Sequence, residues 1–335
     1  MEKIKVAING FGKIGRETFK ILLEMKEIDL VAVNDLTNPA TLAHLLKFDS
    51  VRGRFQGEIA SGDHNITVNG KSVYIYAERD PLKLPWSELG VDIVIECTGL
   101  FTDEESSMKH IQAGAKKVII SAPGKGNMKT IVLGVNNHLL NGDEKVISNA
   151  SCTTNNAAPM FKILDEVFGI ESAYFTTIHA YTGDQNLHDG PHRDLRRARA
   201  AALSIIPTTT GAAKAVIDVM PQLAGKLGGT AMRVPVPVGS ITDITCVLKK
   251  AASVEEINQA FQTAAAGSMK GIIEYSVDEL VSSDIISNTH SCIIDSVLTS
   301  VNGNMVKVVG WYDNEAGYSN RLAELTLIFG KLIQN

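Results

Sequence analysis

The chain has 335 residues, of which 44% are hydrophobic and 21% are charged, and its formal net charge is −5. These values are typical of a globular protein of about two domains, and the negative charge argues against nucleic acid or an anionic membrane as the main partner. No apolar run reaches the roughly 18 residues that span a bilayer, and no signal peptide precedes the first predicted strand, so we expect a cytoplasmic protein.

A glycine-rich turn stands between the first predicted strand and the first predicted helix. Parallel strands are predicted over 4–9 and 30–33, with a helix over 16–25 between them. The turn reads Gly10-Phe11-Gly12-Lys13-Ile14-Gly15, and Asp35 follows the second strand, 20 residues after Gly15. Such glycines let the backbone approach a pyrophosphate at the helix N-terminus, and the carboxylate accepts hydrogen bonds from a ribose but repels a 2′-phosphate. The unit therefore predicts NAD rather than NADP.

Three more strands are predicted over 72–76, 91–96 and 116–121, with a helix over 101–113. Two turns, at 97–99 and 121–124, close the last two of these strands at their carboxyl ends, where an open α/β sheet binds its ligand. We therefore expect a Rossmann-type NAD-binding domain over residues 1–150.

Cys152 stands where a strand-like run, 145–147, gives way to a helix-compatible run, 157–168. The helix dipole and the free N–H groups of such a position favour a thiolate. Most free cysteines are inert, and the other three, Cys97, Cys246 and Cys292, lie in strand-like runs that predict core positions. The four are far apart and lack zinc-ligand spacing, so we expect free thiols in a reducing compartment and no metal site.

The remainder of the chain is rich in strands. Strands are predicted over 171–181, 231–236, 240–249, 271–275, 291–301 and 305–312, and helices over 211–220 and 254–266. Asn302-Gly303 predicts a hairpin with a type I′ turn. This pattern predicts an α+β domain with a mainly antiparallel or mixed sheet over residues 151–314. Apolar residues at helical spacing between 322 and 332 predict a core-facing terminal helix.

Three polar features of this second part are candidates for catalysis or for binding an anion. His179 ends a strand, and could place an imidazole beside the thiol. Thr210-Gly211 opens a helix and suits either a phosphate or simple N-capping, while Arg233 lies in an apolar strand and needs an anionic partner. The arginine-rich stretch 184–202 predicts a subunit interface or a network of loop ion pairs rather than a nucleic-acid site.

Eight stretches, in order along nearly the whole chain, resemble the phosphorylating, NAD-dependent glyceraldehyde-3-phosphate dehydrogenases of glycolysis. They are INGFGKIGR at 8–16, ERDP at 78–81, SNASCTTN at 148–155, TIHAYTGDQ at 177–185, DGPHRDLRRARAAA at 189–202, IIPTTTGAAKAV at 205–216, AMRVPVP at 231–237 and WYDNEAGYS at 311–319.

The resemblance implies a homotetramer in which residues 315–335 return as a helix to the NAD-binding domain. It implies that Cys152 is the nucleophile and His179 its partner. It assigns Thr182 and Arg233 to the substrate phosphate, and Ser151, Thr153, Thr210 and Gly211 to inorganic phosphate. For NAD it implies Gly10, Gly12, Lys13, Ile14, Gly15, Asp35, Arg79, Ser121, Asn314 and Tyr318.

The chain departs from the family at one point, because Asn156 stands where SCTTNC commonly has a second cysteine. This removes a route to a nearby disulfide but leaves the nucleophile. Leu36, Gly190 and Pro191 resemble the members that use NAD rather than NADP.

The implied reaction converts glyceraldehyde 3-phosphate, NAD and inorganic phosphate into 1,3-bisphosphoglycerate through a cysteine thiohemiacetal and thioester. One alternative is an erythrose-4-phosphate dehydrogenase, which uses water as acyl acceptor and tends to lose the Thr182 and Thr210-Gly211 pattern. Another is a redox-sensing or RNA-binding protein on the same scaffold. The intact Cys152 and His179 pair argues against that last reading.

Overall fold

The computed structural model describes residues 2–334, which form two compact units. The first unit comprises the chain up to Ile131, Asn137–Ala150, and the chain from Ser319 onwards. The second comprises Val132–Asn136 and Ser151–Tyr318.

The described part of the first unit contains a nine-stranded sheet in the order β10-β11-β9-β8-β1-β2-β7-β6-β5. The strands are β1 (Ile4–Asn9), β2 (Ile28–Asn34), β5 (Ile59–Ser61), β6 (Asn65–Val68), β7 (Lys71–Tyr76), β8 (Ile93–Glu96), β9 (Lys117–Ile120), β10 (Lys129–Thr130) and β11 (Val146–Ser148). From β10 to β7 the neighbours are parallel, and β5, β6 and β7 pair antiparallel. The parallel part is the predicted Rossmann-type sheet, whereas the antiparallel edge formed by β5 and β6 was not predicted.

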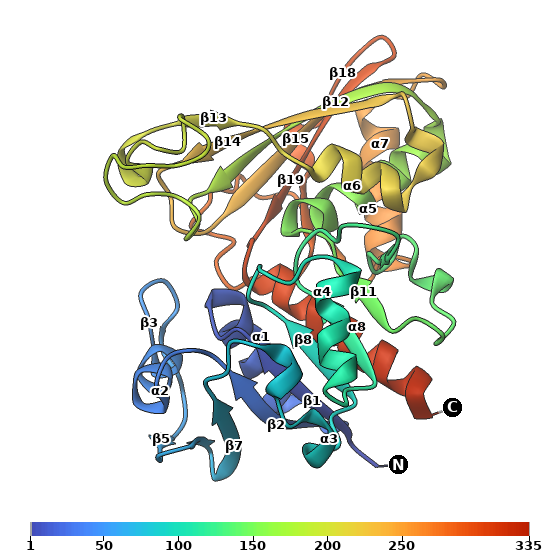
Figure 1. Ribbon diagram of the computed structural model, residues 1–335. Helices are drawn as coiled ribbons and strands as arrows, with labels where there is room; N and C mark the ends of the chain where they lie inside the picture. The colour runs from blue at the N-terminus through green and yellow to red at the C-terminus, as the bar shows by residue number, and fades with distance from the viewer. Residues whose placement is uncertain (1, 335) are drawn as a thin grey trace. The chain divides into compact units, whose positions relative to one another are not determined.

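Helices on both faces of this sheet bury its central strands (Figure 1). They are α1 (Lys13–Glu24), α2 (Pro39–Lys47), α3 (Trp86–Leu89), α4 (Glu104–Gln112) and α8 (Ala316–Gln334), and β3 (Phe48–Asp49) with β4 (Gly53–Arg54) forms a small separate ribbon. The central residues Val6, Val94 and Ile119 have no exposed surface, which explains why these strands are apolar without alternation.

From Ser319 onwards the terminal helix α8 packs within the first unit, as predicted. Lys117 Nζ lies 4.9 Å from the ring centroid of Phe329 on α8. A Cβ at Gly330 would meet Ile4 side-chain atoms at 2.6 Å, so a side chain here would not fit against β1.

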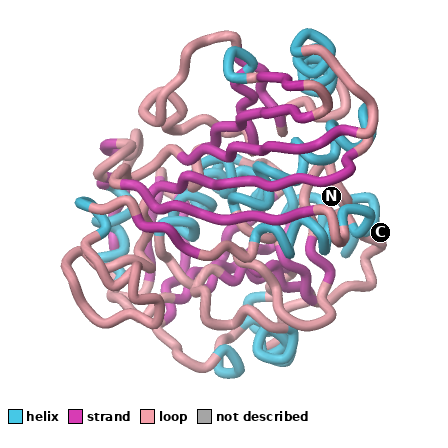
Figure 2. Tube along the Cα trace, turned by 90° about the horizontal axis from the view of Figure 1, so that it is seen from above, coloured by secondary structure: helices cyan, strands magenta, loops and turns pink. Residues whose placement is uncertain are grey.

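The second unit contains, in its described residues, an eight-stranded mixed sheet in the order β13-β14-β12-β15-β19-β17-β16, with β18 paired to β19. The strands are β12 (Ile170–Ala180), β13 (Ile206–Thr208), β14 (Leu227–Val234), β15 (Ser240–Leu248), β16 (Ile273–Ser276), β17 (Cys292–Asp295), β18 (Ser300–Asn302) and β19 (Met305–Tyr312). Only β12–β14 and β16–β17 are parallel pairs among them, which confirms the predicted mixed, mainly antiparallel sheet. The long strands lie side by side in Figure 2.

Three helices of the second unit, α5 (Cys152–Phe168), α6 (Ala212–Val219) and α7 (Val254–Ala266), gather on one face of its sheet (Figure 1). Helix α5 is central and buries most of its first three turns, including Ala157, Met160 and Phe161. The opposite face of the sheet leaves Tyr174 and Met232 exposed.

Several predicted elements differ from the observed ones for local reasons. The hairpin after Asn302 is present, but Gly303 alone has a positive φ (62°), which is the pattern of a type II′ turn and not of the predicted type I′ turn. The predicted strand 291–301 is interrupted after Asp295 by a 3₁₀ turn. The predicted helix from 101 begins at Glu104, because the Asp103 carboxylate accepts from Ser106 N at 2.9 Å and caps it.

Candidate active site

Cys152 is the first residue of α5, three residues beyond the Asn149 that follows β11. Ala150 turns the chain with a φ of +56°, an unusual value for a residue with a Cβ, at a cost of about 1–2 kcal/mol. Ser151 then caps the helix, since its Oγ accepts from Thr154 N at 3.0 Å. The predicted strand-to-helix turn is confirmed, and it presents the sulfur at the helix N-terminus.

His179 lies directly beside this sulfur. Cys152 Sγ is 3.3 Å from His179 Nε2, although the two residues are 27 positions apart. Strand β12 carries the imidazole, which is 5% exposed. Its Nδ1 lies 2.6 Å from Ala180 O, a contact that needs a proton on Nδ1 and so leaves Nε2 as the nitrogen with a lone pair. A neutral histidine in this state can accept a proton from the thiol.

Arg233, on the neighbouring strand β14, adds a positive charge beside the imidazole. The two residues are cross-strand partners, and Arg233 Nη1 lies 2.5 Å from His179 Nδ1 and 3.0 Å from Ala180 O. Because two N–H groups cannot bond each other, the carbonyl is the better partner of this guanidinium nitrogen. Arg233 Nε is buried and has no hydrogen-bond partner among the described residues, as expected of a cation that awaits an anion.

Burial sets the resting protonation of the pair. It lowers the pKa of His179 to about 3, and the charge of Arg233 acts in the same direction. Burial also raises the pKa of Cys152, although Arg233 and hydrogen bonds at the helix start act to lower it. Hydrogen bonds at the helix start thus lower the pKa of the thiol, in the predicted direction, but burial acts more strongly against the thiolate.

Tyr312, the last residue of β19, supports both partners and was not singled out from the sequence. Its Oη lies 2.9 Å from Thr153 Oγ1 and 2.8 Å from Thr177 Oγ1, and its ring meets that of His179 edge-on at 5.9 Å. A buried tyrosine needs a partner for its hydroxyl, and here it links α5 to β12. The sequence contains no local signal for this role because the partners are more than a hundred residues away.

The other residues predicted to bind anions occupy helix starts and strand ends in the second unit. Ser151 caps α5 and Thr153 lies in its first turn, on either side of Cys152 in the chain. Thr210 Oγ1 accepts from Ala212 N at 3.1 Å, and Gly211 precedes α6 without a side-chain cap. Thr182 follows β12, and its N–H donates to Gln185 Oε1 at 3.2 Å.

The glycine-rich turn of the first unit borders a cavity of about 400 Å³. Its lining includes Gly10, Gly12, Asp35, Arg79 and Thr98. A Cβ at Gly10, whose φ is +94°, would lie 2.7 Å from the backbone of Cys97, whereas a Cβ at Gly12 would meet nothing within 4 Å. The chain thus approaches its neighbour closely and leaves open space over the start of α1, which fits a pyrophosphate.

Asp35 also fits its predicted place. It follows β2, and its two carboxylate oxygens accept from Phe11 N at 2.9 Å and Thr37 N at 3.1 Å. Each oxygen keeps a lone pair for a ribose hydroxyl. The residues of the cavity therefore suit a dinucleotide.

The other predicted cofactor residues have varied surroundings. Gly15 lies so close to Gly10 O that a Cβ would be 2.2 Å from it, and Ile14 lies in the first turn of α1. Lys13 pairs with Asp49 at 2.7 Å, and Ser121 hydrogen-bonds the Cys97 thiol. Two more, Asn314 and Tyr318, belong to the second unit and are largely buried.

The arginine-rich stretch 184–202 contains the predicted network of ion pairs. Arg197 pairs with Asp184 and donates to Thr208 Oγ1, and Arg199 pairs with Asp189 at 3.0 Å. These contacts fold the stretch back on itself and on β13.

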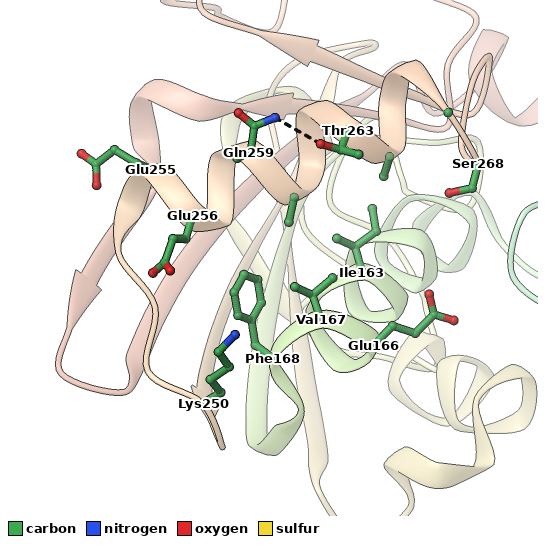
Figure 3. A pocket seen from close by; sticks show the side chains of 13 residues that line it. Ile163, Glu166, Val167, Phe168, Lys250, Glu255, Glu256, Gln259, Thr263 and Ser268 are labelled. Carbon is green, nitrogen blue, oxygen red and sulfur yellow. Dashed lines mark hydrogen bonds between the residues drawn. The ribbon is translucent and has the colours of Figure 1, made fainter.

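A second cavity, of about 800 Å³, lies between α5 and α7 (Figure 3). Apolar side chains such as Ile163 and Phe168 form its floor, and Glu166 and Lys250 stand at its rim. None of the predicted site residues lines it, and it holds no cysteine or histidine. We therefore exclude it as the reaction centre.

Comparison with known proteins relates both units to one family. Residues 4–104 match the family described as the NAD binding domain of glyceraldehyde 3-phosphate dehydrogenase, and residues 151–314 match its C-terminal domain. A glyceraldehyde-3-phosphate dehydrogenase of Mycobacterium avium is 56% identical over 335 residues, covering 98% of this chain and 99% of the relative. That of Mycobacterium tuberculosis strain H37Rv has the same identity and coverage. That of Streptomyces coelicolor is 56% identical over 331 residues, covering 98% of each chain.

Proposed function

Since the chain belongs to the glyceraldehyde-3-phosphate dehydrogenase family, we propose that Cys152 and His179 carry out the family's reaction. The protein is an NAD-dependent oxidoreductase of glycolysis, and its substrates are glyceraldehyde 3-phosphate and inorganic phosphate. The observation that carries the assignment of these two residues is the 3.3 Å separation of Cys152 Sγ and His179 Nε2. Among the cysteines of the described residues, Cys152 alone lies at hydrogen-bond distance from a histidine.

The first step is addition of the thiol to the aldehyde. The sulfur forms a bond to the carbonyl carbon while the thiol proton passes to His179 Nε2 and then to the former carbonyl oxygen, giving a neutral thiohemiacetal. Nε2 suits this step, because it has a lone pair and lies 3.3 Å from the sulfur. Ala180 O holds the imidazole in the required tautomer.

The second step is oxidation of the thiohemiacetal. NAD, when bound, supplies the hydride acceptor. His179 Nε2 takes the hydroxyl proton as the carbon loses hydride, and a thioester on Cys152 results. Gly10, Gly12, Lys13, Ile14, Gly15, Asp35, Arg79, Ser121, Asn314 and Tyr318 would hold the cofactor.

The third step transfers the acyl group to inorganic phosphate. A phosphate oxygen attacks the thioester carbon, the carbon–sulfur bond breaks, and the sulfur leaves as a thiolate that regains a proton from His179. Two anion sites are needed. We assign Arg233 and Thr182 to the phosphate of the aldehyde, and Ser151, Thr153, Thr210 and Gly211 to inorganic phosphate; the unpartnered Arg233 Nε supports the first assignment.

We further propose a homotetramer in a reducing cytoplasm. Support for self-association comes from exposed apolar side chains of the second unit, namely Tyr174, Leu187, Leu195, Leu203, Ile205 and Met232. All four cysteines are free thiols, as is usual in a reducing compartment. Every described helix is too short or too polar to cross a bilayer. A monomeric mass by light scattering at working concentration would contradict the assembly.

The function is tested by following NADH formation with glyceraldehyde 3-phosphate and with erythrose 4-phosphate, each with and without inorganic phosphate. We expect rapid NADH formation only with the three-carbon aldehyde and phosphate together. Phosphate-independent oxidation of the four-carbon aldehyde would instead indicate hydrolysis of the thioester by water.

A further inference from the structure

Asn314, just beyond β19, has one end of its side-chain amide fixed by two donors. Its Oδ1 accepts from Gly239 N at 3.2 Å and from Ser240 Oγ at 3.1 Å, and the residue is 5% exposed. A backbone N–H can only donate, so rotating the amide would set its NH₂ group against the N–H of Gly239. The oxygen therefore faces Gly239 and Ser240. The Nδ2 group has no acceptor among the described residues.

Ser240 has a single proton, and its other contact decides where that proton goes. Ala180 N donates to Ser240 Oγ at 3.1 Å, so the hydroxyl must accept there. Ser240 has no exposed surface, which excludes water as a competitor. Its proton is thus directed to Asn314 Oδ1. Gly239 is required beside it, because a Cβ there would lie 2.4 Å from Ser282 O.

This short chain of hydrogen bonds starts next to the proposed base. Ala180 follows His179, and Ala180 O is the acceptor that sets the imidazole tautomer. Hydride transfer needs the acceptor ring within about 3–3.5 Å of the carbon attached to Cys152. Asn314 is linked to Ala180 through the hydroxyl of Ser240. As a cofactor-binding residue it is therefore expected to contact the nicotinamide end of NAD, whose polar group is the carboxamide.

We propose that Ser240 is a positioning residue that fixes the Asn314 amide, so that Nδ2 donates to the carboxamide oxygen of NAD. The proposal rests on the proposed function, because it takes Asn314 as a cofactor residue. It adds a residue that touches neither the cofactor nor the substrate. Ser240 would act on cofactor affinity through Asn314 alone.

The test measures dissociation constants by calorimetry for NAD and for its thionicotinamide analogue, whose sulfur is a poorer acceptor than the carboxamide oxygen. Ser240→Ala should weaken NAD binding by about fivefold, the value of one net hydrogen bond. It should also reduce the preference for NAD over the analogue. Ser240→Thr, which keeps the hydroxyl, should restore both values.

Thr242→Val is the matched control. Thr242 lies two residues along β15, is equally buried, and its hydroxyl has no partner among the described residues. This variant should bind both cofactors as the unaltered chain does. Should Ser240→Ala not fold, Ser240→Cys provides the same test with a weaker donor.

A double-mutant cycle tests the positioning of Asn314 by Ser240, called the relay below, separately from the proposed function. Asn314→Ala should weaken NAD binding, and adding Ser240→Ala to it should cause no further loss. Equal, additive losses would overturn the relay while leaving Asn314 as a cofactor residue. Unchanged NAD affinity in Asn314→Ala would overturn the assignment of Asn314 itself, and the relay with it.

Discussion

Two buried histidines, one in each unit, show how the surroundings decide what an imidazole can do. His110 in the first unit is fully buried, and both ring nitrogens have partners: Trp86 Nε1 donates to Nδ1 at 3.0 Å, and Nε2 lies 3.2 Å from Glu96 Oε2. The indole N–H can only donate, so it fixes the Nε2–H tautomer. His179 in the second unit instead directs a nitrogen with a lone pair at a thiol. Only the second histidine is therefore placed to accept a proton from a thiol.

The groups around the two histidines also differ in whether their hydrogen bonds are all made within the protein. Glu96 accepts from His110, from Asn9 Nδ2 at 2.5 Å, and from both the backbone N and the hydroxyl of Thr98. These groups satisfy one another and leave nothing for a ligand. Beside His179, by contrast, Arg233 keeps a buried donor without a described partner. The first cluster is complete in itself, whereas the second keeps a buried guanidinium donor that could bind an anion.

Removing the thiol beside His179 should have the largest effect of the changes considered, and the effect should be on turnover. Cys152→Ser should lower kcat by on the order of 10⁴-fold or more, since the thioester cannot form. NAD affinity, measured by calorimetry, should change little. The buried Cys292→Ser serves as the control for loss of a thiol elsewhere in the second unit. Turnover near that of the unaltered chain would remove Cys152 from the nucleophile role.

Removing the proposed base, His179, should have the next largest effect on turnover. His179→Asn should lower kcat by about 10²–10⁴-fold. Alkylation of Cys152 by iodoacetamide should also titrate at higher pH, because the thiol then ionises without a proton acceptor and burial raises its pKa. An alkylation curve that does not move along the pH axis would contradict the pairing of the two side chains.

The sequence predicts local features of both regions and misses those that depend on distant contacts. The glycine turn and Asp35 lie within one βαβ unit, so spacing alone locates them. Tyr312 and Ser240 were missed because Thr177 and Ala180, their partners, are 135 and 60 residues away. The effect of burial on the pKa of the thiol was missed for the same reason: the helix start is visible in the sequence, whereas burial is set by the whole unit. The edge strands β5 and β6 were missed because they are only three and four residues long, too short for an alternating pattern to stand out.

The buried cluster around His110 should respond in stability and not in chemistry. His110→Phe leaves the Trp86 N–H without an acceptor and takes one donor from Glu96, so the free energy of unfolding should fall by about 2–3 kcal/mol. Urea titration followed by tryptophan fluorescence measures this. His138→Phe, at an exposed histidine, is the control. The alkylation curve of Cys152 should stay in place, and a shift would mean that the two regions are coupled.

Lowering the pH should reduce the free energy of unfolding through His179, by less than the His110 substitution does. The folded-state pKa of His179, about 3, is below its ordinary value of 6.5, so the unfolded chain binds the proton first. Its contribution to stability is therefore complete above pH 6.5 and is lost as the pH falls towards 3. Between pH 7 and pH 5 this should cost about 1–2 kcal/mol in the unaltered chain and less in His179→Asn. His188→Asn, at an exposed histidine, should show the loss of the unaltered chain.

The smallest expected effect is on the preference for NAD over NADP. The same variants test whether a substitution in the first unit leaves the reactivity of the Cys152 thiol unchanged. Asp35→Gly removes the charge that repels a 2′-phosphate, so the preference for NAD over NADP should fall by about tenfold. It also removes the acceptor of Phe11 N and Thr37 N, which loosens the turn. Asp35→Asn keeps an acceptor oxygen and loses only the charge, so it should relax the preference while retaining more NAD affinity than the glycine variant. Unaltered preference in both variants would show that the carboxylate does not select the cofactor, whereas a changed alkylation rate of Cys152 would show that the first unit influences the thiol.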